Sequence, residues 1–145
     1  MPGHEGYGTV VAIGGGDRVV AFGGYMLVDQ RFAARIPDGC DPVDLAPILC
    51  AGITVYEGHQ VAGTTPGQWM GISDIGGLGH VAVQCARAMD MRVAAVDIGD
   101  DKLELAREVG SDVAVNANDG HVAAAIVEQT GGERTIEGRM VVDNR

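Results

Sequence analysis

A glycine-rich turn between two apolar runs is the part of this chain best suited to chemistry. Residues 69–97 have the pattern of a strand, a turn, a helix and a second strand that ends at Asp97. The turn glycines Gly76, Gly77 and Gly79 would let the backbone approach a pyrophosphate, whose charge is favoured by the free N–H groups at a helix start. The carboxylate of Asp97 would accept hydrogen bonds from a ribose, so the pattern predicts a Rossmann-type dinucleotide site.

One position departs from the dinucleotide fingerprint. The pattern G-x-G-x-x-G would place its first glycine at position 74, where this chain has Asp74. At about 4 Å, two like unit charges repel by about 1 kcal/mol in water and about 4 kcal/mol at an effective dielectric constant of about 20. We therefore expect Asp74 to weaken pyrophosphate binding by about one to three orders of magnitude. Aspartate tolerates a left-handed backbone better than most residues, so we expect the turn itself to form.

Strands and helices alternate through the second half of the chain. Alternation of this kind predicts parallel strands with right-handed crossovers, so the fold class is α/β with a partial Rossmann sheet of order βαβαβα. Two residues predict a lower stability for this domain than ideal residues at the same positions would give. Gly71 lies within a strand, and Asp90 lies where glycine would end a helix better. The expected elements are 68–73, 77–89, 92–97, 101–109, 112–116 and 119–130.

The first third of the chain has a different pattern. Residues 8–35 hold short apolar runs separated by glycine and aspartate turn signals, which predict a β-rich segment. Helical spacing then runs from Val43 to Tyr56, until residues 63–67 break it. A last apolar run at 136–142 predicts a lone terminal strand.

Charge and cysteine content restrict the partners and the compartment. A net charge of −10 disfavours nucleic acid and anionic membranes as partners. The three cysteines include no C-x-x-C pair, which argues against a disulfide framework and for a cytoplasmic protein. We expect no signal peptide, and no apolar run reaches the ~18 residues that cross a bilayer.

Four segments together resemble the zinc-dependent medium-chain alcohol dehydrogenases, in the order of that family. The resemblance covers nearly the whole chain and implies a GroES-like domain beside a Rossmann domain. The segments are 2–14 (PGHEGYGTVVAIG), 46–56 (APILCAGITVY), 66–97 and 136–143 (IEGRMVVD).

The resemblance implies NAD-dependent hydride transfer between a primary alcohol and its aldehyde, with zinc polarising the oxygen. It implies zinc ligands His4 and Cys50, with Glu5 beside the metal as a substitute for a missing third ligand. The implied catalytic residues are His4, Glu5, Cys50 and Thr54. The implied NAD-binding residues are Asp74, Ile75, Gly76, Gly77, Leu78, Gly79, Asp97, Ile98 and Lys102.

Three blocks of the family pattern are missing from this sequence. They are the segment with the first cysteine ligand, the lobe with four structural-zinc cysteines, and the second half of the nucleotide domain. The expected domains are therefore a reduced β-rich GroES-like domain, residues 1–50 plus 134–145, and a partial Rossmann domain, residues 51–133.

Two other functions remain open. One is a non-catalytic folded remnant that binds nucleotide weakly, or associates with itself or with a full-length relative through the exposed edges of its sheet. In that case Cys50 is a packing residue and His4 a turn residue. The other is a zinc-free quinone or enone reductase of the same superfamily, against which Cys50 and the G-H-E segment argue.

Overall fold

A computed structural model describes residues 6–13 and 24–132. Contacts within the chain divide it into two units, Met1–Cys50 and Ala51–Arg145, and each unit is described by itself. The predicted assignment of residues 134–145 to the first domain stays a prediction, because these residues lie outside the described part.

The second unit contains a three-stranded parallel sheet. Its strands are β1 (Trp69–Ser73), β2 (Arg92–Asp97) and β3 (Val113–Asn116), in the order β1-β2-β3. The register pairs Gly71 with Ala94, and Ala94 with Val113. In the described part of the chain, β1 pairs with β2 alone, so its outer edge is unpaired. The predicted half of a Rossmann sheet is confirmed.

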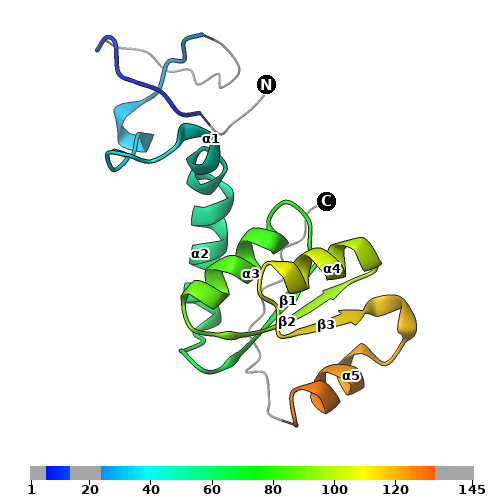
Figure 1. The fold of residues 1–145 in the computed structure, drawn as a ribbon. Coiled ribbons are helices and arrows are strands. Elements are labelled where there is room, and N and C mark those ends of the chain that lie inside the picture. Colours follow the sequence, from blue (N-terminus) through cyan, green and yellow to red (C-terminus); the bar gives the residue numbers. More distant parts are fainter. Residues whose placement is uncertain (1–5, 14–23, 133–145) are drawn as a thin grey trace. The chain divides into compact units, whose positions relative to one another are not determined.

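Helices cover both faces of this sheet (Figure 1). Helices α3 (Gly79–Ala88) and α4 (Asp100–Glu108) lie on one face, and α5 (Val122–Gln129) lies on the other. The larger core forms beneath α3 and α4, where small residues of the helices let them approach the strands. It is built around Met70, Ile72, Ala82, Ala86, Val93, Ala95 and Ala106. A smaller cluster, with Trp69, Ala94, Val113 and Val115, packs against α5.

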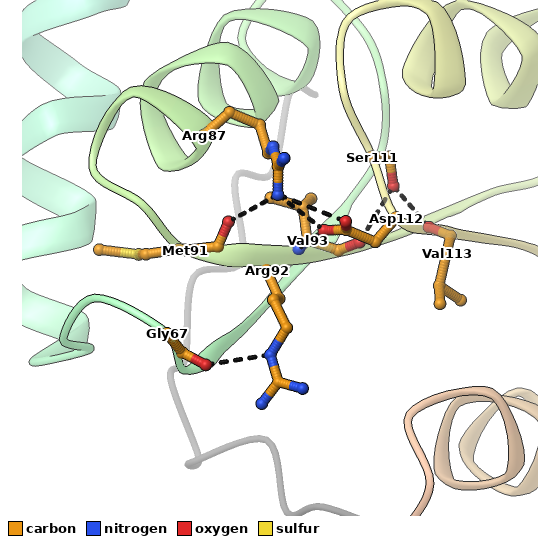
Figure 2. Close-up of polar contacts among 8 residues, drawn as sticks. All are labelled: Gly67, Arg87, Met91, Arg92, Val93, Ser111, Asp112 and Val113. Carbon is orange, nitrogen blue, oxygen red and sulfur yellow. Dashed lines mark hydrogen bonds and ion pairs between the residues drawn. The ribbon is translucent and has the colours of Figure 1, made fainter.

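Polar contacts hold the ends at which the strands begin (Figure 2). Arg87 donates to the carbonyl of Met91 at 3.2 Å and pairs with the carboxylate of Asp112 at 3.1 Å. Asp112 also accepts from the backbone N–H of Val93 at 2.7 Å, which links the start of β3 to β2. These contacts stabilise the amino ends of the strands. In open α/β sheets, binding sites usually lie at the opposite, carboxyl ends.

Helix α2 (Ala51–Ala62) packs against α3 and buries a histidine. The Nε2 atom of His59 lies 3.1 Å from the carbonyl oxygen of Ala82, and 1% of the residue is exposed. Its Nδ1 atom has no hydrogen-bond partner among the residues that the structure describes. Burial lowers the pKa of His59, with the bond to Ala82 opposing that shift.

The prediction of a β-rich first segment is wrong for the residues that the structure describes. Residues 6–13 and 24–41 contain no strand, and only a 3₁₀ turn at Gln30–Phe32. The apolar runs remain exposed, with Ile13 at 94% and Tyr25 at 84%. Strands need paired backbone partners and a buried face, and these runs have neither in the described part. The expected run at 18–22 and the terminal strand at 136–142 lie outside the described residues.

The predicted helix from Val43 to Tyr56 is interrupted. The structure has a short α1 (Pro42–Leu45), a 3₁₀ turn at Pro47–Leu49, and then α2. Pro47 has no backbone N–H to donate to the preceding turn, so the hydrogen-bond pattern of a continuous helix is interrupted at this point. None of the helices in the described ranges is long and apolar enough to cross a membrane.

Replacing Asp90 by glycine should stabilise the protein. Asp90 follows α3 with a φ of 57°, a left-handed conformation that glycine adopts without the steric cost of a Cβ. We expect Asp90→Gly to raise the free energy of unfolding by about 0.5–1 kcal/mol, measured by urea denaturation. The same change in a right-handed helix, Asp101→Gly in α4, should lower it by about 1 kcal/mol. Equal effects at the two positions would contradict the conformational explanation.

The stability of the protein should fall in mild acid because of His59. Its pKa is lowered in the folded state, so the unfolded chain binds a proton more readily. The stabilising contribution is complete above pH ~6.5 and is lost as the pH falls below that value, by at most about 1.4 kcal/mol per pH unit. Urea unfolding at pH 7 and pH 5 measures this loss. Between these two pH values, the free energy of unfolding should fall less in His59→Leu than in the unaltered protein. As a control, His121→Asn at an exposed position should lose as much free energy of unfolding between the two pH values as the unaltered protein.

Candidate nucleotide site

The turn after β1 is tight enough to require glycine at one position. Asp74 has a φ of 67°, and its backbone N–H donates to the carbonyl of Val96 at 2.9 Å. A Cβ atom at Gly79 would lie 2.0 Å from the carbonyl oxygen of Asp74. The first turn of α3 therefore packs directly on the backbone that leaves β1. Asp74 takes the left-handed conformation, so the expectation that the turn forms despite it is confirmed.

The glycine turn presents free amides to the surface. In the part of the chain that the structure describes, no hydrogen bond is formed by the backbone N–H groups of Gly76, Gly77 and Leu78. A Cβ at Gly77 would meet nothing within 4 Å, so the space outside this backbone is open. Free amides and open space at the start of α3 are what an anionic group needs.

Asp97, at the end of β2, is tied to the same turn. Its Oδ2 accepts from the N–H of Ile75 at 2.6 Å, and its Oδ1 accepts from Ile98 at 2.7 Å and Gly99 at 2.9 Å. The residue is 5% exposed. Burial by itself would raise the pKa of Asp97, but three backbone N–H groups and the ammonium of Lys102 outweigh it and hold the pKa below its usual range. The carboxylate stays ionised and anchors the turn to β2.

Lys102 lies between two carboxylates at this edge of the sheet. Its Nζ is 3.6 Å from Asp74 and 3.8 Å from Asp97. The side chains of Lys102 and Asp74 are each 42% exposed. This ion pair was not predicted from the sequence, which indicated only an uncompensated charge at Asp74. The signal was available in the topology, because α4 begins beside the turn when β2 is the neighbour of β1.

The other predicted cofactor residues differ in exposure. Ile75 is 2% exposed and belongs to the core, and its backbone N–H is donated to Asp97, so it supports the turn from inside. Leu78 is partly buried against the same core. Ile98 is 68% exposed directly after Asp97, where an apolar side chain could contact a flat base.

The predicted zinc site is only partly covered by the structure. His4 and Glu5 lie outside the described residues. Cys50 is half-buried at the end of the first unit, and Thr54 is exposed on α2. Among residues 6–13 and 24–132, no three His, Cys, Asp or Glu side chains are grouped to hold a metal. The structure therefore brings together the residues that are predicted to bind a nucleotide. The metal-binding roles of His4, Glu5 and Cys50 stay a prediction.

Comparisons with known proteins show what this chain is similar to. A family model described as "Zinc-binding dehydrogenase" matches residues 77–136. An alcohol dehydrogenase of Geobacillus stearothermophilus is 48% identical over 108 residues, which cover 74% of this chain and 32% of that protein. An acetophenone reductase of Geotrichum candidum, solved in complex with NAD, shares 34% identity and a TM-score of 0.52, over 57% of this chain and 24% of its own.

A second relative shows that this chain is internally shorter. The alcohol dehydrogenase of Moraxella sp. (strain TAE123) is 38% identical over 173 positions, which cover 91% of this chain and 51% of the relative. An alignment longer than the 145 residues of this chain means that the relative carries internal residues that this chain lacks. The aligned part of this chain spans 32% and 51% of the length of these two curated relatives. The chain belongs to the medium-chain dehydrogenase family, in a shortened form.

Proposed function

We propose that this chain binds NAD at the turn between β1 and α3, as part of an alcohol dehydrogenase-type oxidoreductase. The observation that carries the proposal is the set of open amides at Gly76, Gly77 and Leu78, on a backbone that Gly79 packs tightly. The names of the relatives support hydride transfer between an alcohol and its carbonyl compound.

The charges at the site favour NAD over NADP. Asp97 stands where the adenosine ribose is expected, and a carboxylate there repels a 2′-phosphate. An NAD-bound relative, the reductase of Geotrichum candidum, is consistent with this choice.

The residues of this chain would position the cofactor rather than react. NAD, when bound, supplies the acceptor for a hydride. The amides of the turn would hold the pyrophosphate, and the exposed side chain of Ile98 would lie against the adenine. A ribose hydroxyl would have to share Asp97 with the backbone donors, because the side chain of Asp97 is 2% exposed.

Zinc is the second part of the proposal and rests on the family resemblance. His4, Cys50 and Glu5 would hold the metal, which would act as a Lewis acid on an alcohol oxygen. The substrate would be a small alcohol or aldehyde.

A second candidate is nucleotide binding without catalysis. Two observations favour it: Asp97 is already committed to three backbone N–H groups, and the chain covers 51% of its Moraxella relative. Such a protein would bind NADH but would produce none from ethanol and NAD.

An alanine at Gly77 should separate binding from folding. Its Cβ meets no protein atom within 4 Å, so we expect the fold to keep its stability. The new methyl group would occupy the space that a pyrophosphate needs, and we expect NADH affinity to fall by about tenfold or more, measured by calorimetry. The matched control is Gly71→Ala in β1, which also has open space around it and should leave affinity unchanged. If Gly77→Ala binds NADH with unchanged affinity, the proposal that NAD binds at this turn is wrong.

Metal content and activity should depend together on Cys50. We expect about one zinc per purified chain, and ethanol-dependent formation of NADH. Cys50→Ser should remove both, while Cys85→Ser on α3 should remove neither. Absence of zinc and of activity, with NADH still bound, would leave the non-catalytic candidate in place.

A further inference from the structure

We propose that Lys102 is the counter-ion of Asp74, so that the two side chains together add no net charge toward a phosphate ligand at the turn. The inference rests on the proposed function and concerns the one residue at which this chain departs from the glycine fingerprint. It assigns Lys102 a specificity role that depends on Asp74, and it corrects the expectation that Asp74 acts as an isolated negative charge.

The geometry places Lys102 where it can serve both carboxylates. Its Nζ lies 3.6 Å from Asp74 and 3.8 Å from Asp97. Asp97 is nearly enclosed and accepts three backbone N–H groups in addition to its ion pair with Lys102. Within the described residues, the carboxylate of Asp74 accepts no backbone hydrogen bond, and its side chain is 42% exposed. Lys102 is therefore the local group that offsets the charge of Asp74.

The composition makes this pairing unusual. Lys102 is the only lysine in the chain, and the other nine basic residues are arginines. The chain has a net charge of −10, so basic side chains are few, and one of them lies beside the glycine turn. Of the cations on α4, Lys102 lies in the first turn, whereas Arg107 lies in the last and donates to Ala114.

Neutrality of the pair leads to a pattern that single charges would not produce. Without Lys102, the carboxylate of Asp74 would face an incoming phosphate unopposed. Without Asp74, the ammonium would attract the phosphate unopposed. Without both, the net charge beside the turn would equal that of the unaltered protein, and we expect the affinity to return to its value. Because both side chains are partly exposed, added salt should reduce the single effects.

The test compares four proteins: the unaltered chain, Asp74→Asn, Lys102→Gln and the double variant. Binding of NADH and, separately, of inorganic pyrophosphate is measured by calorimetry at low and high salt. We expect affinity about tenfold tighter in Asp74→Asn, about tenfold weaker in Lys102→Gln, and within about threefold of the unaltered protein in the double variant. Arg107→Gln, which removes a positive charge from the same helix, should change nothing.

The outcomes separate the inference from the proposed function. If pyrophosphate follows the expected order and NADH binds to no variant, the dinucleotide proposal fails and the counter-ion role stands. If NADH binds equally to all four proteins, the counter-ion role fails and the dinucleotide proposal stands. If neither ligand binds to any variant, Asp74→Asn included, both fail. Circular dichroism and urea unfolding of each variant establish that the chain remains folded.

Discussion

The contact between the first turn of α3 and the backbone that leaves β1 organises the whole site. A Cβ at Gly79 would lie 2.0 Å from the carbonyl oxygen of Asp74, so the helix can approach this closely only through a glycine. The bond from Ile75 to the buried carboxylate of Asp97 then fixes the turn to the neighbouring strand. Together they hold the turn in a conformation in which the N–H groups of Gly76, Gly77 and Leu78 form no hydrogen bond within the described residues. The conformation of the turn is thus a consequence of packing and does not require a ligand.

Most of the second unit could be predicted from the sequence because its signals are local. Apolar runs of strand length alternate with helical patterns, and short turns separate them, so each boundary fell within about three residues. Asp74 and Asp90 were expected in positions that favour glycine, and both have positive φ values. The parallel order of the strands follows from alternation and crossover handedness.

The first third could not be predicted in the same way because its pattern depends on distant partners. The runs at 9–13 and 25–28 have strand-like composition, yet they pair with nothing in the described residues. Side-chain pattern specifies which face of a strand is apolar, but a sheet also needs neighbouring strands to accept its hydrogen bonds. The Lys102–Asp74 pair was missed for a related reason: the two residues are far apart in sequence and meet through the sheet. The roles of His4, Glu5 and Cys50 remain predictions.

Within the described residues the outer edge of β1 is unpaired, which has a consequence for how the protein behaves at high concentration. An open strand edge can recruit a strand from another molecule, which leads to aggregation unless something keeps the molecules apart. Here the net charge of −10 supplies mutual repulsion between copies. That protection weakens in concentrated salt and vanishes near the isoelectric point of about 4.6. Solubility of this chain should therefore be greatest in dilute buffer well above that pH.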